Sequence, residues 1–445
     1  MTAAPQTIPL NGIDRSYLIS ETEQEDGVYF PMSIVMVIKL RSPFLPAELV
    51  AALQALVKQY PNLRLGYSLD VSKRHWVRIA PDHLADHFAA CIQEIPQIQS
   101  IEDTIATLVA VNNTSLTQPL NLFVAGDFLI LRMHHSFGDG KFLFLITQYL
   151  LAELQQQPVD QLPLSDQWWM PLWRVIWQDV GQGLEVMWRF VKSSLLYYQE
   201  YQRDTSANPD HPARYPITTG SPMQVCFKAI DPDCLTLLRE MRGDFSLNTL
   251  LQVIIEERLN QLGWITRPTT YTIPVDLRRY LKDRDVYHPG NLAAQVRITL
   301  EAEMPVMQRC VVLQTRIQEQ LQQKMPLVSI PGEWLLALGG NQTYQSVNRD
   351  WLLKSTHHDP RFFILTNLGN VDGAFRPVDA LLSDQFDPQL VVPLMGGPPL
   401  VCSFNEHRNR GNLAITFDPQ VLSRSDIEAI LEAFDRSSLK SLAGQ

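Results

Sequence analysis

The chain has 445 residues, of which 45% are hydrophobic and 19% are charged, and its net charge at pH 7 is -10. This composition is typical of a globular protein with a large core and excludes a disordered chain. The acidic balance disfavours a general nucleic-acid binder, and the length suggests two domains or two halves of one larger unit.

Five widely spaced cysteines form no CxxC pair, so the sequence favours a reduced, cytoplasmic compartment. The first residues lack a basic segment followed by an apolar one, and no run of about 18 apolar residues occurs anywhere. We therefore expect neither a signal peptide nor a membrane-spanning helix.

The first part of the chain alternates between strand and helix patterns. The expected elements are a strand at 30–40, a helix from 46 to about 60, a strand at 76–79, a helix at 101–111, a hairpin of strands at 122–125 and 128–133, and a buried helix at 142–151. This alternation predicts an α/β unit that ends near residue 165.

The heptapeptide HHSFGDG, His134 to Gly140, joins the second strand of that hairpin to the buried helix. An imidazole titrates near neutral pH and can take a proton from a hydroxyl or an amine, so a histidine on this turn is a candidate general base. Gly138 and Gly140 permit tight backbone geometry, and the helix that begins here presents amides that can hold a developing oxyanion.

The segment from Trp168 to Tyr198 contains five of the nine tryptophans. Its apolar residues share one side at about 100° per residue, which predicts an amphipathic helix. This helix either packs on the protein itself or touches a membrane surface or a lipidic substrate. We prefer packing, because the polar side carries little net positive charge. A proline-bearing linker is expected at 204–216.

The second part of the chain repeats the α/β alternation. The expected elements are strands at 223–230, 269–275, 292–300, 362–365, 400–404 and 413–417, and helices at 235–241, 247–262 with Ser246 as its cap, 306–323 and from about 425. The predicted organisation is an N-terminal half at 1–165, the Trp-rich helix and linker at 166–220, and a C-terminal half at 221–445.

A second histidine pair, His357 and His358 followed by Asp359, invites a metal site. Adjacent side chains on an extended chain point to opposite faces and do not easily share one ion, so we expect no metal. The GxSxG, P-loop and dinucleotide-binding fingerprints are absent from the sequence, which removes the commonest serine hydrolase, NTPase and Rossmann alternatives.

The heptapeptide resembles the HHxxxDG signature of the condensation-domain and CoA-dependent acyltransferase superfamily at His134, His135, Asp139 and Gly140. Further stretches resemble that superfamily in the same order, namely PLNGIDRSYL, YPNLRLGY, SLNTLL, PVDLRRYL followed by PGN, TNLGNVDG and SFNEHRNRGNLAITFDP. The pattern extends over nearly the whole chain. It is most similar to wax ester synthase/diacylglycerol acyltransferases and polyketide-associated O-acyltransferases, and the DFGWG element of the plant branch has no clear counterpart.

The resemblance implies an α/β fold of two chloramphenicol-acetyltransferase-like halves that form a pseudo-dimer with a central substrate tunnel. It implies that His135 is the base that takes a proton from the acceptor hydroxyl. His134, Asp139 and Gly140 would be structural, and Asp139 would pair with an arginine, for which Arg278 is the best positional match. The candidate tunnel residues are Gly138, Thr366, Asn367, Ser403 and Asn405.

The expected reaction transfers a fatty or polyketide acyl group from coenzyme A or an acyl carrier protein to a lipid or secondary-metabolite alcohol. A thioester already carries a good leaving group, so proton removal, positioning and oxyanion stabilisation suffice, without a tightly bound cofactor or a metal. Two alternatives stay open. One is amide formation of the condensation type, and the other is an inactive member that binds lipid or a carrier protein.

Overall fold

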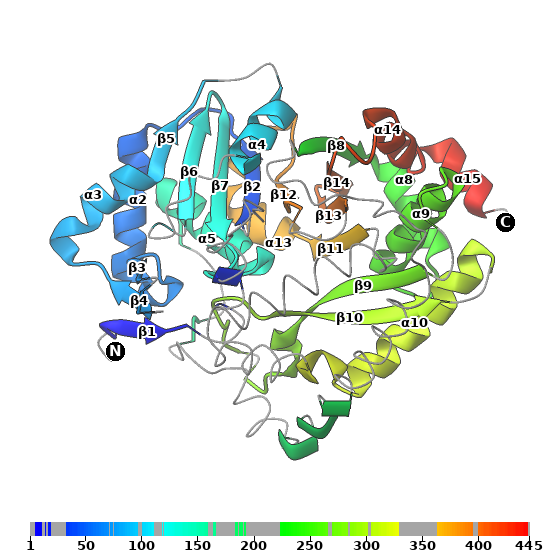
Figure 1. Cartoon of the computed structure of the whole chain (residues 1–445). Coiled ribbons are helices and arrows are strands. Elements are labelled where there is room, and N and C mark those ends of the chain that lie inside the picture. Colours follow the sequence, from blue (N-terminus) through cyan, green and yellow to red (C-terminus); the bar gives the residue numbers. More distant parts are fainter. Residues whose placement is uncertain are drawn as a thin grey trace.

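The computed structural model describes residues 5–10, 14, 17–18, 33–70, 72–73, 75–96, 100–110, 118, 120–158, 163–165, 183–185, 187–189, 191–192, 223–265, 269–283, 285–300, 304–328, 363–394 and 399–443. The described chain forms two α/β halves side by side, with the N-terminal half in blue and cyan and the C-terminal half mainly in green, yellow and red (Figure 1). Each half has its own sheet and its own apolar core.

The N-terminal half is built on a five-stranded sheet of order β12-β2-β7-β6-β5. Its strands are β2 (Ser33–Lys39), β5 (Ile92–Glu94), β6 (Leu120–Ala125), β7 (Phe128–His134) and β12 (Gln389–Val391), and its helices are α2 (Pro46–Gln59), α3 (Leu84–Cys91), α4 (Ile101–Ala110) and α5 (Gly140–Leu154). A small sheet of β1 (Thr7–Pro9), β4 (His75–Arg78) and β3 (Tyr67–Asp70) lies beside it. The apolar runs of the sequence become buried strands here because both faces of this sheet are covered.

The C-terminal half is built on a six-stranded sheet of order β10-β9-β11-β13-β14-β8. Its strands are β8 (Gln224–Ile230), β9 (Thr269–Asp276), β10 (Ala293–Leu300), β11 (Phe363–Asn370), β13 (Leu400–His407) and β14 (Arg410–Phe417), and its helices are α8 (Pro232–Met241), α9 (Leu247–Gln261), α10 (Val306–Gln322), α14 (Arg424–Glu432) and α15 (Arg436–Ala443). The hydroxyl of Ser246 accepts a hydrogen bond from the Thr249 amide and caps α9, as the sequence predicts.

A crossing segment, residues 371–394, runs from the C-terminal half into the N-terminal half and back. It contains α13 (Asp372–Phe375), the 3-10 helix η6 (Arg376–Leu381) and β12. Strand β12 pairs antiparallel with β2, and Phe375 and Leu382 are fully buried in the N-terminal core. The N-terminal sheet is therefore completed by residues from the predicted C-terminal range, so the two ranges of sequence do not each build one half alone.

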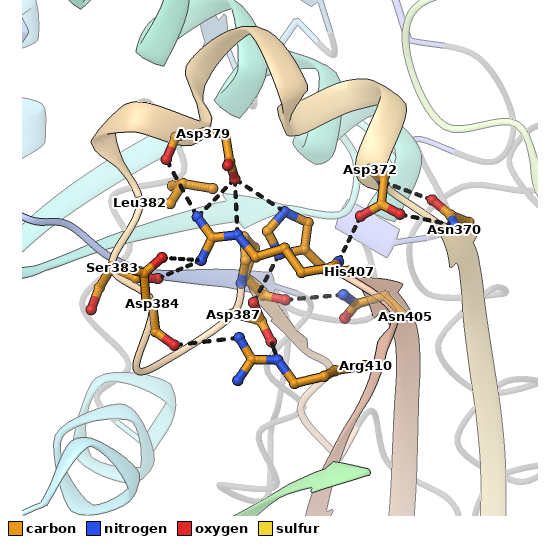
Figure 2. A network of polar contacts seen from close by, with 12 residues as sticks. Asn370, Asp372, Asp379, Leu382, Ser383, Asp384, Asp387, Asn405, His407 and Arg410 are labelled. Atoms are coloured by element: carbon orange, nitrogen blue, oxygen red, sulfur yellow. Dashed lines mark hydrogen bonds and ion pairs between the residues drawn. The ribbon is translucent and has the colours of Figure 1, made fainter. Parts of the chain in front are cut away.

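A polar network fixes the crossing segment to the end of β13 and the start of β14 (Figure 2). Nδ1 of the buried His407 lies 2.8 Å from a carboxylate oxygen of the buried Asp387, whose other oxygen lies 3.2 Å from the guanidinium of Arg410. The guanidinium of Arg408 donates to the carboxylate of Asp379 in η6. Buried polar groups with partners on both sides hold one arrangement of the segment, because leaving any of them unpaired is costly.

The Trp-rich helix lies largely outside the described residues, as does the predicted linker. Residues 183–185, 187–189 and 191–192 are helical, and Leu184, Trp188 and Val191 are 79%, 69% and 42% exposed. These three apolar side chains are exposed in the structure, and because most of the helix lies outside the described residues, its packing on the protein stays a prediction. Across the described part of the chain, no helix combines the length and the apolar character needed to cross a membrane.

Candidate active site

The HHSFGDG turn lies where strand β7 ends and helix α5 begins. His134 is the last residue of β7 and pairs with Ser33 of β2, which places the following turn at the end of the sheet. Asp139 caps α5, because its Oδ1 accepts a hydrogen bond of 3.0 Å from the Phe142 amide. Both His134 and His135 are buried, with 2% and 7% exposure.

Asp139 binds the C-terminal half through its second carboxylate oxygen. Nη1 of Arg278 lies 2.7 Å from Oδ2 of Asp139, and the backbone amide of Leu292 donates to the same oxygen at 2.9 Å. The ion pair that the resemblance implies between Asp139 and Arg278 is thus present. It joins two side chains that are 7% and 11% exposed, so it is a buried pair between the two halves.

Arg278 organises the loop that carries the PGN stretch. Its Nε donates to the His288 carbonyl and its Nη2 to the Gly290 carbonyl, both at 2.8 Å, and its guanidinium stacks over the ring of Tyr287. Although burial opposes the charged form, Asp139 and its other neighbours raise the pKa of Arg278 above the ordinary value. The charged guanidinium is therefore a fixed support for this loop rather than a group that exchanges protons.

His135 is held by residues from two distant parts of the chain. The side-chain Nδ2 of Asn291 lies 2.9 Å from Nδ1 of His135 and donates to the His135 carbonyl oxygen at 3.0 Å. The ring of Tyr17 stacks on the imidazole with centroids 4.2 Å apart and planes 5° apart. Within the described part of the chain, no hydrogen bond to Nε2 of His135 is present.

Burial lowers the pKa of His135 to about 4, and the negative charge of Asp139 partly opposes this shift. The imidazole is therefore neutral at pH 7 and has a lone pair available on one ring nitrogen. His134 has a different role in the turn: its Nδ1 lies 2.6 Å from the Ser136 hydroxyl and accepts from the Ser136 amide at 3.1 Å. Those contacts fix the turn and fit the structural assignment of His134.

The two glycines of the turn are required by close approaches. A Cβ atom on Gly138 would lie 2.2 Å from Cδ1 of Phe142. A Cβ atom on Gly140 would lie 3.1 Å from Leu390 of the crossing segment and 3.5 Å from Leu368 of β11. Gly140 therefore lets the C-terminal half pack directly on the first turn of α5.

The start of α5 offers fewer amides to an oxyanion than a helix N-terminus usually does. Asp139 already accepts from the Phe142 amide through its side chain and from the Leu143 amide through its carbonyl oxygen. The amides of Gly140 and Lys141 are the ones that these two contacts leave for a developing negative charge.

The candidate tunnel residues of the C-terminal half fall into two groups. Thr366 and Asn367 lie on β11 and are partly exposed. Ser403 and Asn405 are buried on β13, where the Ser403 hydroxyl donates to the Leu390 carbonyl and the Asn405 amide donates to the Pro388 carbonyl at 3.1 Å. These two side chains hold the crossing segment, and no described contact places them at a channel.

Two residues at the site were not identified from the sequence. Asn291 belongs to the PGN stretch and Tyr17 to the PLNGIDRSYL stretch, so both motifs mark the site although no local pattern distinguishes either residue. Asp14, also in that stretch, is buried beside Arg64, whose guanidinium donates to the Pro289 carbonyl at 3.4 Å. The N-terminal motif and the PGN loop therefore meet at His135.

The described residues contain no group of three or more histidine, cysteine or acidic side chains arranged to hold a metal ion. His357, His358 and Asp359 lie outside the described part of the chain, so the expectation that this pair binds no metal stays a prediction.

Comparison with known proteins finds similarity in structure but not in sequence. No protein-family model and no curated protein matches the chain. The TRI3 trichothecene 15-O-acetyltransferase from Fusarium sporotrichioides is similar with a TM-score of 0.65 at 12% identity, over 98% of this chain and 96% of that one. The condensation domain of the monacolin K polyketide synthase MokA gives 0.59 at 12%, over 99% and 98%.

A third solved structure, the EpoB NRPS cyclization-docking bidomain from Sorangium cellulosum, gives a TM-score of 0.62 at 17% identity, over 99% of this chain and 85% of that one. At these identities the likeness establishes the fold. The chain therefore has the mixed α/β, two-lobed fold shared by condensation domains and this O-acetyltransferase, with two chloramphenicol-acetyltransferase-like halves.

Proposed function

We propose that this protein is an O-acyltransferase that moves a fatty or polyketide acyl group from a thioester to an alcohol, with His135 as the general base. The observation that carries the proposal is the setting of His135. It is a buried, neutral imidazole at the junction of the two halves, and the Asp139–Arg278 pair fixes its turn. Few other side chains suit proton removal at pH 7 without a metal.

In this mechanism Nε2 of His135 takes the proton of the acceptor hydroxyl while the hydroxyl oxygen attacks the thioester carbonyl carbon. The tetrahedral intermediate then collapses, the C–S bond breaks, and the thiolate leaves with the proton returned by the imidazolium. The negative charge of the Asp139 carboxylate favours the imidazolium that forms.

 Oδ2 of Asp139 forms an ion pair of 2.7 Å with Arg278, so Asp139 acts on the imidazolium through its charge and not through a hydrogen bond.

The donor and acceptor classes are part of the proposal. The similar solved structures include one O-acetyltransferase and domains of polyketide and nonribosomal peptide synthetases. These names support acyl transfer, and a thioester donor carried either by coenzyme A or by a carrier protein is part of the proposal. They support ester and amide products alike, so a condensation-type amide-forming reaction is the second candidate function.

The test compares wild-type protein with His135→Ala and with the matched control His83→Ala, whose histidine is exposed at the surface. Each is incubated with long-chain acyl-CoA and a mixture of lipid alcohols and amines, and products are identified by mass spectrometry. We expect ester formation that falls by about 100-fold or more in His135→Ala and stays unchanged in the control. Equal turnover in all three proteins would reject the base assignment.

The same experiment separates the alternatives. Amide products in place of esters would indicate a condensation-type enzyme. Binding of acyl-CoA without release of free coenzyme A, with any acceptor, would indicate an inactive lipid-binding or carrier-binding member.

A further inference from the structure

The ring of Tyr17 lies flat against the imidazole of His135. The two ring centroids are 4.2 Å apart and the two planes differ by 5°. Tyr17 belongs to the PLNGIDRSYL stretch, where Asp14 and Leu18 on either side of it are both buried. Leu18 packs in the N-terminal core, and the charge of Asp14 acts on the buried Arg64. Anchored residues on both sides therefore hold the Tyr17 ring at His135.

Acyl transfer by the proposed mechanism places a positive charge on His135. When Nε2 takes the proton of the acceptor hydroxyl, an imidazolium forms, and both burial and the neighbouring His134 oppose its charge. Asp139 favours that charge, but its Oδ2 lies 2.7 Å from the guanidinium of Arg278, so part of its own charge is already neutralised. Asn291, at Nδ1 of His135, is neutral. The imidazolium therefore needs stabilisation from a group that touches the ring itself.

The face of a phenol ring carries the negative part of its quadrupole and attracts a cation that lies over it. The centroid distance of 4.2 Å is within the roughly 6 Å over which this attraction acts. We propose that Tyr17 is a positioning residue for acyl transfer, whose ring fixes the plane of the His135 imidazole and stabilises the imidazolium that forms when the acceptor proton is taken. The inference rests on the proposed function, because this imidazolium forms only if His135 is the base.

Two substitutions separate the effect of the ring face from simple covering of His135. Tyr17→Phe keeps the ring and loses the hydroxyl, whereas Tyr17→Leu keeps an apolar side chain over the imidazole and loses the ring face. Both side chains exclude water, so burial acts on His135 in the same direction in both variants. Tyr60→Leu is the matched control, because Tyr60 is also half-buried and its ring contacts the ring of Tyr149 edge to face, with centroids 4.6 Å apart.

The first measurement is steady-state kinetics with a long-chain acyl-CoA and a long-chain primary alcohol as probes. We expect kcat of Tyr17→Leu to fall by about 3- to 30-fold while KM for both probes stays within about twofold of the wild type, because the interaction is made only after the proton moves. Tyr17→Phe and Tyr60→Leu should keep the wild-type kcat. Equal kcat values in Tyr17→Leu and Tyr17→Phe would overturn the inference.

The second measurement is NMR of protein labelled with ¹³C-histidine, with the His135 signals assigned by their absence from His135→Gln. An aromatic ring stacked on the imidazole moves the Hε1 and Hδ2 signals of His135 upfield. We expect this upfield position in the wild type and in Tyr17→Phe, and its loss in Tyr17→Leu. A wild-type spectrum without it would overturn the inference even if Tyr17→Leu does not fold.

The two proposals fail in different ways. Loss of activity in His135→Ala together with full activity in Tyr17→Leu would reject the role of Tyr17 and leave His135 as the base. Full activity in His135→Ala would reject the proposed function and the role of Tyr17 with it.

Discussion

The ion pair between Asp139 and Arg278 allows a double-mutant test of how the two halves are held together. Its side chains are 7% and 11% exposed, so removing Arg278 leaves the carboxylate of Asp139 buried without a cation, and removing Asp139 leaves Arg278 with only its longer contact of 3.2 Å to Asp276. We expect Asp139→Asn and Arg278→Met each to lower the free energy of unfolding by about 3–5 kcal/mol. Asparagine still caps a helix well, so the cap to Phe142 adds little to the cost of Asp139→Asn.

The double variant is the informative measurement. With both charges removed, no buried charge is left without a partner, so its destabilisation should be smaller than the sum of the single effects by about 2 kcal/mol or more. Urea unfolding followed by tryptophan fluorescence gives the three values. Lys141→Met is the control, because Lys141 is half-exposed in its pair with Asp276 and should cost less than about 1 kcal/mol. Single effects that add to within about 0.5 kcal/mol would refute a coupled buried pair.

Two further predictions concern acid stability and membrane contact. The pKa of His135 is about 4 in the folded state, below its ordinary value of 6.5. Between these two pKa values the unfolded state therefore binds more protons than the folded state. The wild type should therefore lose up to about 3 kcal/mol more stability than His135→Gln as the pH falls from 7.5 to 4, measured by urea unfolding at each pH, and parallel losses would contradict the assigned burial effect. In liposome flotation, wild-type protein should float with the vesicles and the double variant Leu184→Ser, Trp188→Ser should not, because these two exposed apolar side chains would touch the membrane. The control Val311→Ser, which changes another exposed apolar residue, should behave as the wild type. A wild type that stays in the soluble fraction would reject membrane contact.

The local elements are predictable from the sequence, because hydrophobic spacing and capping residues act over a few positions. The strand expected at 128–133 and the helix expected at 142–151 are observed as β7 and α5, with the heptapeptide between them. The three-residue strands β1, β5 and β12 are not predicted from the sequence, whereas the four-residue strand β4 is. Strand β12 has three residues, too few for a periodic pattern, and its position is set by pairing with β2.

Less of the candidate site can be predicted from the sequence, because the site is built by contacts between residues that are far apart in the chain. Arg278 was identified as the partner of Asp139 through the resemblance to a known superfamily, since spacing alone does not relate residues so far apart. Asn291 and Tyr17 carry no local pattern that distinguishes them from other polar and aromatic residues, and their roles depend on packing against His135. Ser403 and Asn405 were expected at a tunnel because of their motif, and their hydrogen bonds to the crossing segment followed only from the fold.

The pairing of β12 with β2 has a consequence for synthesis on the ribosome. Val35 is made early, whereas its partner Val391 is made after most of the chain has been translated. During that interval β2 presents an unpaired strand edge, which is a template for association with other chains. We therefore expect nascent chains that stop before residue 389 to aggregate or to bind chaperones, and release in folded form to require β13 and β14 as well, because His407 and Arg410 hold Asp387 of the crossing segment.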